Sequence, residues 1–152
     1  SNHLDLWRTD GTSSGTMKLA DLGPEDHKPR HLTDVNGTLY FEGYHPIAGA
    51  ELWKTNGSRQ STLMVRDLKT GAASSNLDEF VSFKNQLFFV GNGEIYRTNP
   101  ATGIFARLAG VQSNVSDQAH NLTVWGDTLL FAANDGNGQR LYRSTGFRTG
   151  TS

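Results

Sequence analysis

Apolar residues in this chain come in short runs in which neighbours along the chain are both apolar. The clearest runs are "LYF" at 39–41, "LFF" at 87–89, "LLF" at 129–131, and "LW" at 6–7 and 52–53. A strand with one wet face alternates apolar and polar residues, whereas a strand covered on both faces does not need to. The pattern therefore predicts short strands buried on both faces. It favours sheets stacked between neighbouring sheets over a two-sheet sandwich.

An eight-residue segment, here called the octet, recurs four times along the chain. The copies are "DLWRTDGT" from residue 5, "ELWKTNGS" from 51, "EIYRTNPA" from 94 and "RLYRSTGF" from 140. Three longer segments recur at a similar spacing and align without gaps, at 31–41, 79–89 and 121–131. A period of about 40–50 residues is typical of solenoids and propellers.

Each repeat is expected to hold four short strands. A β-prone stretch follows the first three octets, at 15–22, 61–68 and 103–110. The first two strand types are represented by residues 79–83 and 86–91, which precede the third octet. The last two are represented by residues 51–55 and 61–67, in and after the second octet, so the set is drawn from two neighbouring repeats. The fold class predicted from this pattern is all-β, with four-stranded blades of the β-propeller type.

Turn residues support hairpins over helices. "NG" at 36–37 lies between two β-prone segments and is a strong hairpin signal, because both central residues of a type I′ turn need a positive φ. "DG" at 10–11 and "NG" at 56–57 follow their octet strands in the same way, and we expect hairpin turns there too. Pro100 cannot take a positive φ, so the third octet needs another turn. Weaker hairpin signals are "KN" at 84–85 and "GD" at 126–127.

The first octet and its continuation, "DLWRTDGTSSGTMKLADL" at 5–22, closely resemble the ELWxxDGT repeat of large secreted bacterial proteins. The segments 36–41 and 131–144 resemble the linking part of the same repeat. Tyr96 and Tyr142 replace the tryptophan in the later copies. The resemblance implies a propeller-like tandem repeat in an extracellular or cell-surface setting. It implies no shared enzymatic activity, so no catalytic residue is carried over.

The repeats predict a single repeat domain over 1–152, with units at about 5–50, 51–93 and 94–139 and a partial unit at 140–152. These are about three and a half repeats, fewer than the four blades that a propeller typically needs. Because each blade covers its neighbours, open ends would expose apolar faces. We therefore expect self-association or further repeats of a longer chain.

Composition excludes several classes of partner. The formal net charge is −1 and there is no basic run, so we expect no nucleic-acid binding. No apolar stretch is long enough to cross a bilayer, so we expect no membrane insertion. The chain has no cysteine, which excludes disulfides and thiolate metal sites.

Two sets of residues are candidates for binding. Each octet has an aromatic residue followed by Arg or Lys, and a ring beside hydrogen-bond donors suits stacking against a sugar. The same position equally suits a ring that fills space between sheets. The loops at 42–50, 90–93 and 132–139 differ most between repeats, and loops on a rigid scaffold often carry specificity. The candidate residues are Trp7, Trp53, Tyr96 and Tyr142 in the octets, and Tyr44, His45 and Pro46 in the longest loop.

The signals for chemistry are weak. "GTSSG" at 11–15 matches a nucleophile motif through Ser13, but that motif needs a strand before it and a helix after it. Asp135 and Asn137 have the spacing of two calcium ligands but lack the remaining ligands of an EF-hand loop, and no other cofactor is expected. A hydrolase would have to use scattered carboxylates, and a zinc site would have to bring together loop histidines and a carboxylate. These residues are Asp26, Asp78, Glu79 and Asp117 for the hydrolase, and His27, His31 and Asp26 for zinc.

We therefore expect a non-catalytic extracellular β-repeat module whose role is binding, adhesion or scaffolding, with a protein or a glycan on a surface as the partner. A lectin-like carbohydrate-binding module is the alternative, and a hydrolase is the more remote one.

Overall fold

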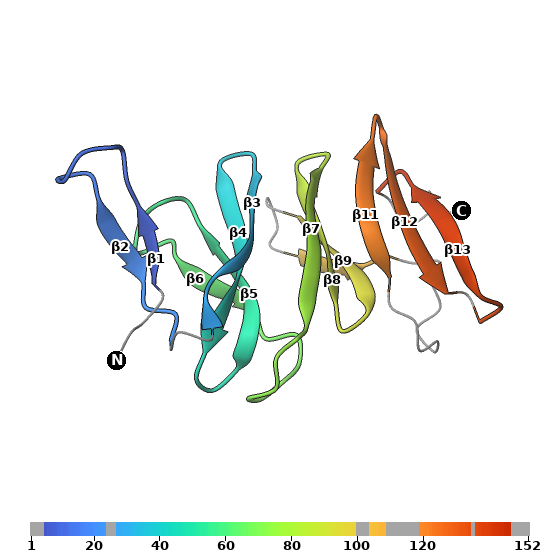
Figure 1. Ribbon diagram of the computed structural model, residues 1–152, viewed down its shortest axis with the longest axis horizontal. Coiled ribbons are helices and arrows are strands. Elements are labelled where there is room, and N and C mark those ends of the chain that lie inside the picture. Colours follow the sequence, from blue (N-terminus) through green and yellow to red (C-terminus); the bar gives the residue numbers. More distant parts are fainter. Residues whose placement is uncertain (1–4, 24–26, 100–103, 109–118, 135, 147–152) are drawn as a thin grey trace. The chain divides into compact units, whose positions relative to one another are not determined.

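β-strands account for nearly all the regular structure in the computed structural model of the chain (Figure 1). The structure describes residues 5–23, 27–99, 104–108, 119–134 and 136–146. All strand pairs are antiparallel and form four sheets of two, four, four and three strands, none of them closed. The all-β prediction is therefore confirmed. The chain forms two compact units, Ser1–Leu77 and Asp78–Ser152, and the single domain over 1–152 stays a prediction.

The first unit holds two sheets. The smaller one pairs β1 (Leu6–Arg8) with β2 (Met17–Ala20). The larger one is a meander in the order β3-β4-β5-β6. Its strands are β3 (Arg30–Val35), β4 (Thr38–His45), β5 (Gly49–Thr55) and β6 (Leu63–Arg66).

The second unit also holds two sheets. Its four-stranded sheet is formed by β7 (Leu77–Phe83), β8 (Gln86–Gly91), β9 (Glu94–Asn99) and β10 (Ile104–Arg107). Its three-stranded sheet is formed by β11 (His120–Trp125), β12 (Thr128–Asn134) and β13 (Gln139–Ser144). The predicted strands agree closely with β5, β6, β7 and β8. The β3–β6, β7–β10 and β11–β13 sheets each take their first two strands from the segment before an octet and their third strand from the octet itself.

Hairpin connections are confirmed at all five predicted places, but only two of them have positive φ at both turn residues. Asn36 and Gly37 have φ values of 52° and 82°, as a type I′ turn requires, and the "KN" pair at 84–85 also has positive φ at both residues. At the octet turns only Gly11 and Gly57 have positive φ, at 91° and 90°. Those two connections are therefore not two-residue hairpin turns. They are longer loops, which begin after Arg8 and Thr55.

Burial on both faces is confirmed in β8, where the side chains from Leu87 to Val90 are at most 2% exposed. In β12 the prediction is wrong. There burial alternates, with Leu129 and Phe131 fully buried and Leu130 only half-buried. One face of the β11–β13 sheet is therefore less covered than the equivalent face of β8.

Each sheet has two distinguishable faces, set by the alternation along the octet strand. We call the face that carries the first apolar residue of the octet the forward face; its residues are Leu6, Leu52, Ile95 and Leu141. The opposite face, which carries the octet ring, is the backward face. In β8 and β9, Val90 lies opposite Ile95 on the forward face, and Phe89 lies opposite Tyr96 on the backward face.

The two cores follow one rule, in which the forward face of a sheet packs on the backward face of the next sheet along the chain. In the first unit Leu6 of β1 packs with Phe41 and Trp53 of the β3–β6 sheet. In the second unit the same rule joins β7–β10 to β11–β13. That core contains Phe88, Val90 and Ile95 from the earlier sheet and Leu129, Phe131 and Ala133 from the later one.

Candidate functional site

The octet rings occupy equivalent places in three sheets. Each stacks on a fully buried phenylalanine of the neighbouring strand, and the rings are cross-strand partners. The pairs are Phe41 with Trp53 at 6.3 Å between centroids, and Phe89 with Tyr96 and Phe131 with Tyr142 at 5.6 Å each. Such pairs add about 0.5–1.5 kcal/mol beyond the area they bury. Because one face of each ring is used in packing, the arrangement suits the filling of space within the fold.

Trp7 differs from the other octet rings because it is 57% exposed. The hypothesis that octet rings hold sugars stays a prediction, and among these rings Trp7 offers the most accessible surface.

The octet cations have a role that the sequence interpretation did not include. Arg8 donates through Nη1 to the carbonyl oxygen of Gly57 at 2.8 Å, and Arg97 donates through Nη1 to that of Gly146 at 2.9 Å. Each cation lies on the forward face and reaches the turn glycine of the next octet in the chain. In each pair the arginine and the glycine are 49 residues apart in the sequence. This equal spacing was the signal from which the link could have been predicted.

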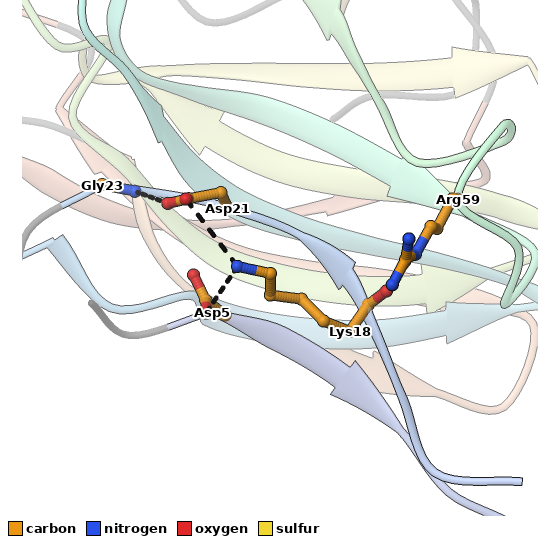
Figure 2. A network of polar contacts seen from close by, with 5 residues as sticks. All are labelled: Asp5, Lys18, Asp21, Gly23 and Arg59. Carbon is orange, nitrogen blue, oxygen red and sulfur yellow. Dashed lines mark hydrogen bonds and ion pairs between the residues drawn. The ribbon is translucent and has the colours of Figure 1, made fainter. Parts of the chain in front are cut away.

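A polar network joins the two sheets of the first unit at another point (Figure 2). Arg59 donates through Nε to the backbone oxygen of Lys18 at 2.7 Å. The Lys18 ammonium lies 3.1 Å from Asp5 and 3.8 Å from Asp21, whose carboxylate also accepts from Gly23. The Lys18 side chain is about a third exposed, so this pairing contributes at most about 1 kcal/mol.

The loops after the first two octets are organised by the same side-chain hydrogen bonds. Asp10 accepts from the amide of Thr12 at 2.9 Å and from its hydroxyl at 2.7 Å. Asn56 accepts from the amide and hydroxyl of Ser58 in the same way, at 3.2 Å and 3.0 Å. The two hydrogen bonds from Thr12 lower the pKa of Asp10, and the one from the Thr12 hydroxyl has the larger effect. Asp10 and Asn56, the sixth residues of their octets, therefore stabilise the loop that follows the octet strand.

Ser13 lies in the first of these loops, exposed, between β1 and β2. A nucleophile elbow places its serine between a strand and a helix. The segment 11–15 joins two strands, so its local structure is that of a hydrogen-bonded hairpin loop.

In the first two octets the threonine before the loop closes it. Thr55 is 2% exposed, accepts from the amide of Gly57 at 3.0 Å and shares a 2.7 Å hydrogen bond with Thr62. Thr9 makes the equivalent bonds with Gly11 and Thr16, at 3.0 Å and 2.7 Å, but it is exposed.

Thr55→Val should lower the free energy of unfolding by about 1–3 kcal/mol, because the half-buried amide of Gly57 and the Thr62 hydroxyl lose their partner at a buried position. Thr9→Val removes the same bonds where water can replace them, so its cost should be below about 0.5 kcal/mol. Urea unfolding of both variants measures the difference. Equal costs at the two positions would contradict the role of burial.

The first residue of the octet is acidic in three copies, and the partners of its carboxylate differ from copy to copy. Asp5 pairs with Lys18, and Glu94 lies 3.1 Å from Arg107 and accepts from the Tyr96 hydroxyl at 3.0 Å. Glu51 is fully buried. Its two carboxylate oxygens accept from the Ser75 hydroxyl at 2.5 Å and 2.7 Å, and one also accepts from the Leu68 amide at 2.9 Å. Burial raises the pKa of Glu51, and these hydrogen bonds oppose the shift.

The predicted contact residues lie at the end of the β4–β5 hairpin. We call His27, Tyr44, Pro46 and Ile47 the hairpin patch. The rings of Tyr44 and His27 are 3.9 Å apart, and Tyr44 also covers Gly23, where an added Cβ would lie 2.8 Å from its ring. Pro46 is exposed, and Ile47 is 75% exposed, the most of any large hydrophobic residue described.

His45 positions the tip of this hairpin. Its Nδ1 accepts from the amide of Ile47 at 3.3 Å, and its backbone oxygen accepts from the amide of Ala48 at 3.2 Å. Sequence analysis named Tyr44, His45 and Pro46 but missed Ile47. An apolar residue directly after proline in a polar loop was the available signal.

The remaining candidates for chemistry are not brought together in the part of the chain that the structure describes. Asp26, Asp117 and Asp135 lie outside the described residues, while Glu79 accepts from the amide of Asn121 at 3.0 Å. Near Asn137, the side-chain oxygen of Asn134 accepts from the amides of Gly136 and Gly138. Among the described residues there is no group of three or more His, Cys, Asp or Glu side chains placed to hold a metal ion. The same part of the chain has no helix long and apolar enough to cross a membrane.

Comparison with known proteins does not identify a family: no protein-family model matches the chain, and no curated protein matches it significantly. The structure supports a repeat-like all-β protein with four antiparallel sheets.

Proposed function

We propose that the chain is a non-catalytic extracellular binding or scaffolding module, in which blade-like sheets of the propeller type hold the hairpin patch for contact with a protein partner. The extracellular setting rests on the resemblance of residues 5–22 to the ELWxxDGT repeat. The binding role rests on the hairpin patch, and above all on the 75% exposure of Ile47 at its tip.

The hairpin patch has the properties of a protein contact. Ile47 and Pro46 project from a tip that is held by two hydrogen bonds to His45, so little conformational freedom is lost when a partner binds. Tyr44 and His27 form an aromatic base beside them. An aromatic residue next to an apolar tip is a frequent centre of binding energy in protein interfaces. A partner with an apolar pocket and a polar rim would fit this surface.

Photocrosslinking tests the proposal. A benzophenone amino acid at position 47 should crosslink to one defined surface protein when the chain is applied to intact cells. Tyr44→Ala should reduce this product at least about tenfold, since aromatic anchors contribute about 1.4 kcal/mol or more. The same crosslinker at position 63, where Leu63 is 41% exposed, is the matched control. Identical products from both positions would contradict a binding role for the hairpin patch.

The lectin-like alternative rests on Trp7, the one octet ring that is mostly exposed in the described part of the chain. A glycan array separates the two functions. The protein-binding module should show no glycan signal. A glycan signal that disappears in Trp7→Ala would favour carbohydrate binding instead.

A further inference from the structure

The tip of the hairpin patch is held by a histidine at a position where loops normally use an oxygen acceptor. The amide of Ala48 closes a turn on the backbone oxygen of His45, and the His45 side chain accepts from the amide of Ile47, two residues on. Asp, Asn and Ser are the usual residues at the start of such a turn, because their side-chain oxygens accept that amide. Other loops of this chain make the same bond in the usual way, through Asp10, Asn56 and Asn134.

A proton on Nδ1 of His45 removes this acceptor. A neutral imidazole accepts at the nitrogen that carries no hydrogen, whereas an imidazolium only donates. The protonated ring would point an N–H at the Ile47 amide, so the 3.3 Å bond breaks and the ring turns away. Histidine ordinarily gains its proton between about pH 8 and pH 5. The equivalent amide oxygens of Asn56 and Asn134 do not titrate, so the hairpin tip responds to acid where those loops do not.

The surroundings of His45 contain few ionisable groups. Across the hairpin it pairs with Gly49, and the backbone of residues 72–74 that lies against Gly49 carries no ionisable side chain. On the same face of the sheet, the ionisable neighbour along β5 is Glu51, whose buried carboxylate is taken up by hydrogen bonds. Beside it in the hairpin patch are Tyr44 and His27. Among the described residues, none forms an ion pair with His45.

We propose that acid weakens partner binding at the hairpin patch through the proton on His45. This regulation rests on the proposed function of the patch as a contact for a protein partner. Ile47, at 75% exposure, is no longer held in place once its amide loses the bond, so more of its freedom is lost on binding. The imidazolium must also give up water beside an apolar contact, which opposes binding further.

His27 is expected to act differently from His45. Its ring lies 3.9 Å from the ring of Tyr44. A positively charged group on the face of a tyrosine is attracted to it, so protonation keeps this pair together. The effect of acid is therefore assigned to His45 alone.

Amide NMR of the chain without a partner tests the switch itself. The Ile47 amide proton should shift upfield between about pH 7.5 and pH 5.5, in step with the imidazole protons of His45. His45→Asn is the matched variant, because its amide oxygen accepts the same bond, as at Asn56, and does not titrate. Its Ile47 amide should keep one position. An Ile47 amide in the unmodified chain that does not follow His45 would overturn the proposal.

Binding of the fluorescently labelled chain to intact cells at the same two pH values tests the consequence. The unmodified chain should bind about tenfold more weakly at the lower pH, the size of one lost hydrogen bond. His45→Asn should bind equally at both, and His45→Ala should bind weakly at both. His27→Phe, which keeps a ring on Tyr44, should retain the pH effect. An equal loss in His45→Asn would place the titrating group on the partner and overturn the proposal.

The regulation and the proposed function fail in different ways. Binding that Tyr44→Ala abolishes, but that is equal at both pH values in the unmodified chain, would overturn the regulation and leave the proposed function standing. Absence of any Tyr44-dependent binding at either pH would overturn the proposed function and the regulation with it, whatever the Ile47 amide shows.

Discussion

Glu51→Ala is expected to lower the free energy of unfolding by about 3–5 kcal/mol. The carboxylate is fully buried, and its removal leaves the Ser75 hydroxyl and the Leu68 amide without their acceptor. An unsatisfied buried donor costs about 1–3 kcal/mol, and the space left by the side chain adds to this cost. Urea unfolding followed by tryptophan fluorescence measures the loss.

Glu51→Gln is the control that separates the hydrogen bonds from the charge. Its amide oxygen keeps an acceptor for Leu68, and its amide nitrogen donates to Ser75, so stability near neutral pH should be nearly unchanged. A large loss in Glu51→Gln would show that the charge itself is needed.

The raised pKa of Glu51 also predicts how the stabilities of the unmodified chain and of Glu51→Gln differ with pH. A carboxyl whose pKa is higher in the folded chain binds its proton more tightly there than in the unfolded chain. Its contribution is fully present below the unfolded pKa and is lost as the pH rises through the folded pKa. The unmodified chain should therefore lose stability relative to Glu51→Gln over that rise, and an opposite slope would contradict the assignment.

Phe131→Ala should cost about 3–5 kcal/mol, the range for removing a buried aromatic ring. Phe131 is fully buried, stacks on Tyr142 and belongs to the core that joins β7–β10 to β11–β13. Removing it takes away the support of the octet ring as well as core volume. Differential scanning calorimetry measures the change in the transition of the second unit.

Val124→Ala is the matched control on the same sheet, since Val124 is 40% exposed. It should change stability by less than about 0.5 kcal/mol. If Phe131→Ala were as mild as this control, the stacked pair would not be part of the core.

The strands and the two-residue turns could be predicted from the sequence because their signals are local. Paired apolar residues at 87–89 required cover on both faces, and Asn36 with Gly37 required a type I′ turn. The length of the octet turns was not predicted, because Asp10 and Asn56 use their side chains as hydrogen-bond acceptors, which holds a longer loop open. The same dipeptides serve either structure, and the flanking hydroxyl residues decide between them.

The candidate surfaces were less predictable because exposure depends on which sheet covers which. Leu141 and Ile95 are both apolar and hold the same octet position, yet one is exposed and the other is 3% exposed. Likewise Trp7 and Trp53 share one motif and differ in cover. Only the packing of neighbouring sheets distinguishes them, and the local sequence does not record it.

The central claim is that the second, third and fourth octets are structurally equivalent, each placing its ring on the phenylalanine of the neighbouring strand. Nuclear Overhauser effects between aromatic protons test it directly in a chain of 16.6 kDa. The structure predicts ring-to-ring cross-peaks for Trp53 with Phe41, Tyr96 with Phe89, and Tyr142 with Phe131. Cross-peaks for one pair but not the others would show that the recurring octets do not share one structural role, and would contradict the account.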